Sequence, residues 1–121
     1  ITLKDLEKLW KEFSTTKHEA MSIAREAEKR GREALPLLEQ ILKESTAADV
    51  IKIAANSVQK IAPGETIKKM LIAAIPSQKS LAPALKSLQL AKELGTPQAQ
   101  LDKAIKTSMF KQQLSKAAQG E

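Results

Sequence analysis

The first third of the chain carries apolar or small residues at alternating intervals of three and four positions. The spacing runs from residue 3 to residue 41 without a skip, with Lys17 as its one charged member, which places these residues on one face of a helix. Large side chains stand at the two ends of this face, and alanines occupy its middle. We call the large members the N-terminal seam: Leu3, Leu6, Trp10, Phe13, Leu38 and Ile41.

Local signals predict where this first helix begins and bends. Thr2 and Asp5 have the spacing of a capping box, so they predict the helix start. Gly31 and Pro36 disfavour a straight helix, because glycine is flexible and proline removes a backbone hydrogen bond. We therefore expect one long helix over residues 1–44, kinked near Gly31 and Pro36.

The rest of the chain predicts shorter helices separated by proline and glycine. Alternating β-branched runs between turn residues are missing, so we expect no strand, and we find no internal repeat in the sequence. The fold class is therefore expected to be all-α, a bundle of five or six helices. After the first helix, the expected helices cover residues 46–61, 65–75, 80–94 and 97–118.

Charge divides the chain into two parts. Residues 1–44 hold nine basic and nine acidic side chains, whereas residues 45–121 hold eleven lysines and five acidic side chains. The whole net charge of +6 thus belongs to the second part. We expect a charge-neutral helical arm over 1–44 and a basic helical bundle over 45–121, within one domain that could have been cut from a larger protein.

Residues 88–106 have the local signals of two helices joined by a tight turn. Gly95 follows the last expected residue of one helix and can adopt a positive φ, while the small Ala91 would let the two helices approach closely. Thr96 could cap the next helix, with Pro97 at its first position.

This segment resembles the helix-turn-helix DNA-binding motif. The resemblance implies that the second helix enters the major groove, where glutamine can read adenine and lysine can contact phosphate or guanine. A plain helical hairpin would use the same glycine and Thr-Pro signals, so that alternative stays open. The residues expected to face DNA are Gln98, Ala99, Gln100, Lys103 and Lys106.

A second resemblance concerns residues 6–35, LEKLWKEFSTTKHEAMSIAREAEKRGREAL. Their composition is similar to that of helical regions attached to plasmid relaxases and replication proteins. This likeness implies an accessory helical domain of a DNA-processing enzyme whose catalytic residues lie elsewhere.

Several function classes lack the residues they would need. His18 is the only histidine and there is no cysteine, so we expect no catalytic triad, metal site or disulfide. No phosphate-binding glycine loop is present, and we expect no cofactor, no small-molecule substrate and no enzymatic activity. No apolar run approaches the length of a membrane span, and the absence of cysteine fits a cytoplasmic location.

Two hypotheses follow. In the first, the basic part binds duplex DNA through the helix after Gly95, and the first helix brings two copies together as a homodimer. In the second, the chain is a protein-interaction or accessory domain that reads no bases. The N-terminal seam is then either a docking surface for a protein partner or part of the chain's own core.

Overall fold

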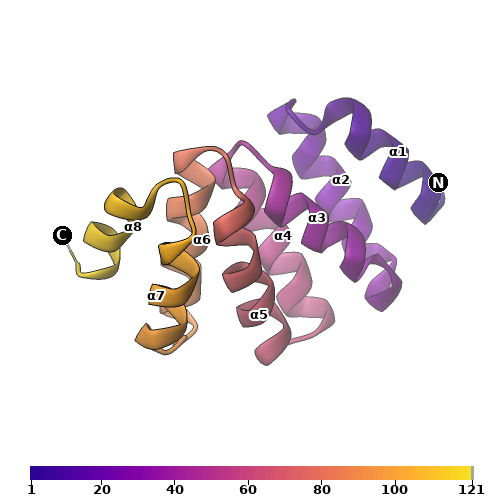
Figure 1. The fold of residues 1–121 in the computed structure, drawn as a ribbon. Helices are drawn as coiled ribbons and strands as arrows, with labels where there is room; N and C mark the ends of the chain where they lie inside the picture. Colours follow the sequence, from indigo (N-terminus) through magenta and orange to yellow (C-terminus); the bar gives the residue numbers. More distant parts are fainter. Residues whose placement is uncertain (121) are drawn as a thin grey trace.

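Helices make up most of residues 1–120, the part of the chain that the computed structural model describes (Figure 1). This part contains no strand, so the expected all-α class is confirmed. The α-helices are α1 (Leu3–Phe13), α2 (Lys17–Lys29), α3 (Leu35–Glu44), α4 (Ala48–Ile61), α5 (Glu65–Ala74), α6 (Leu81–Glu93), α7 (Gln98–Lys106) and α8 (Lys111–Ala118). Two 3₁₀ helices, η1 (Gly31–Ala34) and η2 (Ile75–Ser77), precede α3 and follow α5.

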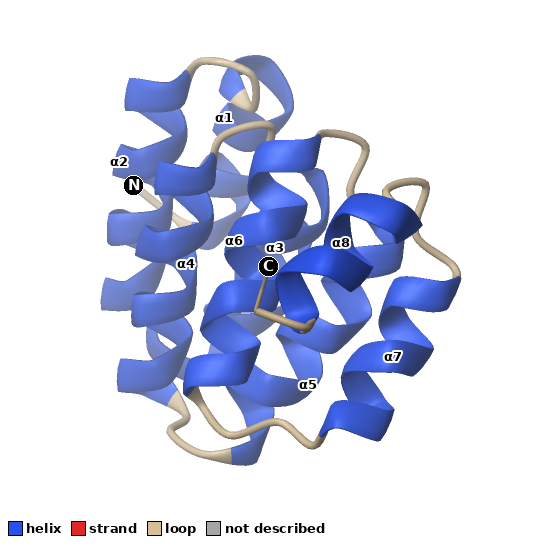
Figure 2. Cartoon of the chain, turned by 90° about the vertical axis from the view of Figure 1, so that its left-hand side faces the viewer, coloured by secondary structure: helices blue, strands red, loops and turns tan. Residues whose placement is uncertain are grey.

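The helices form four antiparallel pairs that are stacked side by side in two layers. Each odd-numbered helix packs against the even-numbered helix that follows it, which gives the pairs α1/α2, α3/α4, α5/α6 and α7/α8. In one layer α2 contacts α4, α4 contacts α6, and α6 contacts α8; in the other, α3 contacts α5 and α5 contacts α7. Figure 2 looks along this stack from its C-terminal end, with α7 and α8 nearest the viewer. The chain is thus built like a short α-solenoid, in which each pair contacts its neighbours.

The expected count of five or six helices is too low, because two expected helices are divided. Residues 1–44 form α1, α2 and α3 instead of one kinked helix. The predicted start of the first helix is confirmed, since Thr2 and Asp5 form both hydrogen bonds of a capping box at the start of α1. Gly31 does interrupt the helix, but Pro36 stands in the first turn of α3, where proline costs no hydrogen bond.

The last expected helix is also divided, at residues 107–110, which separate α7 from α8. Met109, which helical periodicity would turn inward in an unbroken helix, is instead 67% exposed. The helix expected over residues 46–61 begins two residues later than expected, because Ala47 is the N-cap residue of α4, and no side chain caps this helix.

Small residues fill the contact between α2 and α4. Ala20, Ala24 and Ala27 of α2 are fully buried, and the backbones therefore approach closely. Ser57 of α4 shows this proximity, because its hydroxyl lies 3.4 Å from the carbonyl oxygen of Ala24. The same hydroxyl donates a hydrogen bond of 2.9 Å to Glu28 Oε1.

Large side chains dominate the buried faces of the odd-numbered helices. They include Trp10 of α1, Leu38 of α3 and Leu71 of α5, each fully buried. Trp10 also links α1 to α3, since its indole nitrogen donates a hydrogen bond of 2.7 Å to Glu44 Oε1. The two layers thus meet through one continuous core that includes residues from all eight α-helices.

The pairs repeat although their sequences do not. Their first helices begin at residues 3, 35, 65 and 98, so the spacing is 30 to 33 residues. Each connection from one pair to the next contains a glycine with positive φ: Gly31 at 71°, Gly64 at 101° and Gly95 at 83°. Such a repeat needs only helices with an apolar face and a residue that lets the chain reverse direction between pairs. The residues themselves need not be the same in each pair, so the repeat is not visible in the residue identities.

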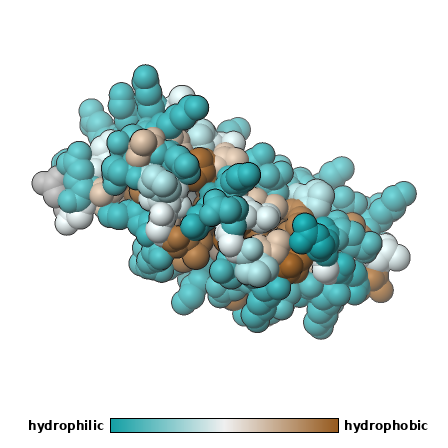
Figure 3. Space-filling model, turned by 90° about the horizontal axis from the view of Figure 1, so that it is seen from below, coloured by the Kyte–Doolittle hydropathy of each residue, from teal (hydrophilic) through white to brown (hydrophobic). Residues whose placement is uncertain are grey.

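Few large apolar side chains remain outside this core. Of the described residues, Ile1 and Met109 are the exposed large hydrophobic ones. Figure 3 shows one edge of the stack as a mostly hydrophilic surface with small hydrophobic patches between the polar side chains. None of the described helices is long and apolar enough to cross a membrane.

The close contact between α2 and α4 can be tested by adding volume to it. We expect Ala24→Leu to lower the free energy of unfolding by about 1–3 kcal/mol, because the added carbons must displace α4 or adopt strained rotamers. Urea denaturation measures this change. Ser22→Leu adds a similar side chain on the exposed side of the same helix and should have little effect. Equal stabilities of the two variants would contradict the close packing.

Candidate functional site

The turn before α7 has the geometry expected at Gly95. The amide of Gly95 donates to the carbonyl of Lys92 at 2.9 Å, and the amide of Thr96 donates to the carbonyl of Ala91 at 3.1 Å. These two bonds form a Schellman motif, which requires the positive φ of Gly95. The predicted glycine turn is therefore confirmed.

The predicted cap at Thr96 is wrong. Pro97 is the N-cap residue of α7, no side chain caps this helix, and α7 begins at Gln98. The side chain of Thr96 turns inward instead, where its hydroxyl finds no hydrogen-bond partner among the described residues. The position after the glycine of a Schellman motif commonly packs against the preceding helix, which explains why this side chain is buried.

The two helices on either side of this turn belong to different layers. Helix α6 lies between α4 and α8, whereas α7 packs against α5, η2 and α8. Ala91 is buried in the layer of even-numbered helices, and α6 and α7 make little direct contact. The helix-turn-helix resemblance implies two helices packed on each other, and this arrangement lacks that direct packing.

All five residues expected to face DNA are exposed, but they do not share one face of α7. Ala99, Lys103 and Lys106 lie on its outward side, opposite the buried Leu101 and Ile105.

The two glutamines lie elsewhere on α7. Gln98 and Gln100 are separated by about 200° around the helix axis, because each residue turns the helix by roughly 100°. The amide nitrogen of Gln98 donates a hydrogen bond of 2.8 Å to Asp102 Oδ1 on the same helix. Gln98 and Gln100 therefore project from different sides of α7.

A groove of about 440 Å³ lies between α7 and the end of α5 with η2. Its apolar lining comes from Ile72, Pro76 and Ala104, and its polar lining includes Gln100 and Lys103. We call it the α5–α7 groove. Gln100 and Lys103 were expected to be exposed, whereas the wall formed by Ile72 and Pro76 was not expected, because no local signal in the sequence links these residues to α7.

Lysines without acidic partners stand beside the α5–α7 groove. Within residues 1–120, no carboxylate oxygen lies within 4.0 Å of the ammonium groups of Lys69, Lys103 or Lys106. Lys69 is exposed on α5, one helical turn before Ile72. By contrast, Lys68 forms an ion pair of 3.3 Å with Glu65. The surface around the groove therefore carries positive charge that no neighbouring carboxylate neutralises.

The N-terminal seam lies inside the molecule. Leu6, Trp10, Leu38 and Ile41 are at most 1% exposed. Leu3 and Phe13 are half-buried and pack against the same core. These positions favour the alternative in which the seam belongs to the chain's own core, because a partner or second copy could reach it only by displacing helices.

No family model, curated protein or solved structure matches this chain. Residues 1–120 contain no group of three or more His, Cys, Asp or Glu side chains that could hold a metal ion.

The conformation of Thr96 generates a stability prediction. We expect Thr96→Val to raise the free energy of unfolding by about 1 kcal/mol, because valine keeps the shape and removes a buried hydroxyl that lacks a partner. Thr96→Ser keeps the hydroxyl and loses the methyl group, so it should lower the stability. Thermal or urea denaturation measures both changes, and a destabilised Thr96→Val variant would mean that the hydroxyl is hydrogen-bonded in solution.

Proposed function

We propose that this chain is a helical-repeat interaction module that binds an acidic, partly apolar segment of a partner protein in the α5–α7 groove. The observation that carries the proposal is that the groove has an apolar lining, formed by Ile72, Pro76 and Ala104, and that lysines without acidic partners stand beside it. Helices and extended segments commonly bind in such grooves through a few apolar anchors.

The architecture supports this proposal. Stacked helix pairs create extended surfaces, and solenoid proteins use such surfaces for binding. Here α5 and α7 are neighbours in one layer, and the groove lies between them. The partner would not need to open the core, because the groove already has a volume of about 440 Å³.

Charge complementarity defines the chemistry of the partner. Lys103 lines the groove and Lys69 is exposed on α5 beside it, so aspartate or glutamate next to an apolar anchor would face positive charge. Residues 45–121 contain eleven lysines and no arginine. Arginine is the preferred residue for bidentate contacts with bases and phosphates, so its absence favours a protein partner over sequence-specific DNA reading.

A selection from a peptide library tests the proposal. We expect the full chain to enrich peptides that combine aspartate or glutamate with leucine, isoleucine or phenylalanine. Lys69→Glu/Lys103→Glu should weaken the binding of these peptides about tenfold or more, because it reverses the charge beside the groove. Fluorescence anisotropy with labelled peptides measures the affinity, and circular dichroism checks that the variant remains helical.

Lys52→Glu/Lys116→Glu is the matched control, since it changes the net charge equally at exposed positions on α4 and α8. It should weaken binding far less. Equal losses in both variants, or enrichment of peptides without acidic residues, would overturn the proposal.

Duplex DNA is the contrasting ligand, and the same proteins test it. If the α5–α7 groove serves a protein partner, random-sequence duplex DNA should bind weakly at low salt, and Gln98→Ala/Lys103→Ala/Lys106→Ala should change that binding little. Tight binding to DNA that falls steeply with salt and is lost in this variant would favour the DNA hypothesis instead.

A further inference from the structure

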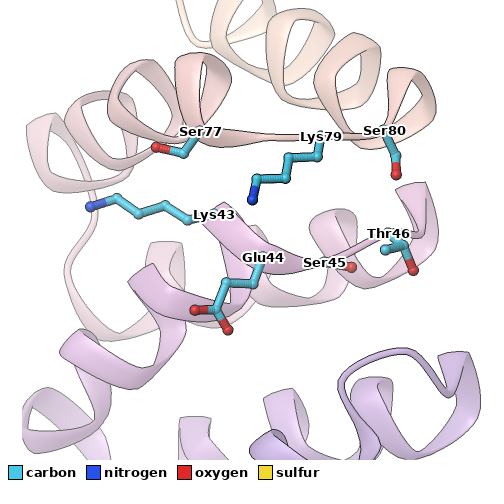
Figure 4. Close-up of a pocket in the computed structure, with 7 residues that line it drawn as sticks. All are labelled: Lys43, Glu44, Ser45, Thr46, Ser77, Lys79 and Ser80. Atoms are coloured by element: carbon cyan, nitrogen blue, oxygen red, sulfur yellow. The ribbon is translucent and has the colours of Figure 1, made fainter.

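A second cavity lies at the C-terminal end of η2. Its volume is about 360 Å³, and it is formed by the connection between α3 and α4 and by the connection between η2 and α6 (Figure 4). Two lysines, four hydroxyl side chains and one carboxylate line it: Lys43, Lys79, Ser45, Thr46, Ser77, Ser80 and Glu44. We propose that this cavity binds a phosphoryl group carried by the partner segment, an inference that rests on the proposed function.

The cavity has walls that the fold holds in place. Gln78, between two lining residues, is 1% exposed, and its amide nitrogen donates to the carbonyl of Leu42 at 2.8 Å and to Ser87 Oγ at 2.7 Å. These bonds tie the η2–α6 connection to the end of α3. On the opposite wall, the amide of Ala47 donates to Ser45 Oγ at 3.2 Å. A ligand would therefore meet a largely preformed site.

The positive charge in the cavity is weakly neutralised. No carboxylate oxygen of residues 1–120 lies within 4.0 Å of the Lys79 ammonium group. Lys43 has only Glu39, at 4.0 Å. In Figure 4 the side chain of Lys79 extends toward α3, into the space between the two connections. The cavity therefore has cationic groups to offer an anion.

The one carboxylate of the lining is directed elsewhere. Glu44 Oε1 accepts the hydrogen bond from Trp10, and both of its oxygens lie 3.3 Å from the amide nitrogen of Gln40. In Figure 4 this side chain turns away from Lys79. The carboxylate of Glu44 is thus hydrogen-bonded to Trp10 and Gln40 and forms no ion pair with Lys79.

Hydroxyl groups without partners line the cavity on both sides of Lys79. The hydroxyls of Thr46, Ser77 and Ser80 make no hydrogen bond to the other described residues. In Figure 4, Ser77 and Lys43 lie on one side of Lys79, and Thr46 and Ser80 lie on the other. Ser80 is also the N-cap residue of α6, so the partial positive charge of that helix end adds to the two lysines. A phosphoryl group carries three acceptor oxygens and a charge of about −1.5 to −2, and therefore uses more of these donors than a carboxylate does.

The cavity and the α5–α7 groove are adjacent in the chain. Pro76 lines the groove and Ser77, the next residue, lines the cavity. A single segment that crosses η2 could therefore place an apolar side chain in the groove and a phosphorylated serine or threonine in the cavity.

The cavity can first be tested without any peptide. We expect inorganic phosphate and free O-phosphoserine to shift the backbone amide resonances of residues 43–47 and 77–80 in NMR titrations of the full chain. Lys43→Ala/Lys79→Ala should abolish these shifts, whereas Lys52→Ala/Lys86→Ala, which removes two lysines outside the lining, should keep them. The absence of shifts with both ligands, or their loss in both variants, would overturn the inference.

A second measurement joins the cavity to the partner segment. In peptides selected for the groove, phosphoserine should bind about tenfold tighter than serine at one position, through one or more added charge-assisted hydrogen bonds. Lys43→Ala/Lys79→Ala should remove this gain and leave the binding of the serine peptide nearly unchanged. If groove binding persists and phosphorylation adds nothing at any position, the inference fails while the proposed function stands. If phosphate shifts these resonances but the chain binds no peptide, the proposed function fails while the cavity still binds a phosphoryl group.

Discussion

The contact between α2 and α4 sets the geometry on which the rest of the stack depends. Alanines on α2 let the two helices approach closely enough for Ser57 of α4 to reach the carbonyl of Ala24. Each even-numbered helix then fixes where its odd-numbered partner lies, because the pairs are joined by short connections. The pair α3/α4 is thereby placed against α1/α2, and the pairs that follow are placed in turn.

The surface has a groove at α5 and α7, where neighbouring helices of one layer pack less closely than α4 and α6 do in the other. The buried faces of α2 and α6 contain small residues such as Ala20, Ala84 and Ala91, which let neighbouring backbones come close. Odd-numbered helices bury large side chains toward the other layer, and α5 and α7 make less contact with each other than α4 and α6 do. The apolar residues Ile72 and Ala104 therefore line a groove that neighbouring side chains do not close.

Periodicity in the sequence predicted which residues are buried better than it predicted where helices end. The three-and-four spacing correctly placed Leu6, Trp10 and Ile41 on an apolar face, and all three lie in the core. It did not detect the break at residues 14–16, because the spacing continues across that turn without a change of phase. Local signals such as the Gly95 turn and the Thr2 capping box were predictable, since they depend on residues next to each other in the chain.

The candidate site was only partly predictable for a related reason. Amphipathic spacing within α7 was enough to find exposed residues such as Gln100 and Lys103. The opposite wall, with Ile72 and Pro76, comes from a helix about thirty residues earlier, and nothing in its own sequence shows that α7 will lie beside it. The spacing of Gly31, Gly64 and Gly95 was the available signal, because it marks the period that brings α5 and α7 together.

The last helix pair occupies a special position in this stack. It has a neighbouring pair on one side only within the described residues, so local opening there should cost less free energy than opening in the middle. The α5–α7 groove spans the boundary between this pair and the one before it. A molecule bound across that boundary would hold the terminal pair in place, so occupancy of the groove and slow hydrogen exchange of α7 and α8 would be thermodynamically linked.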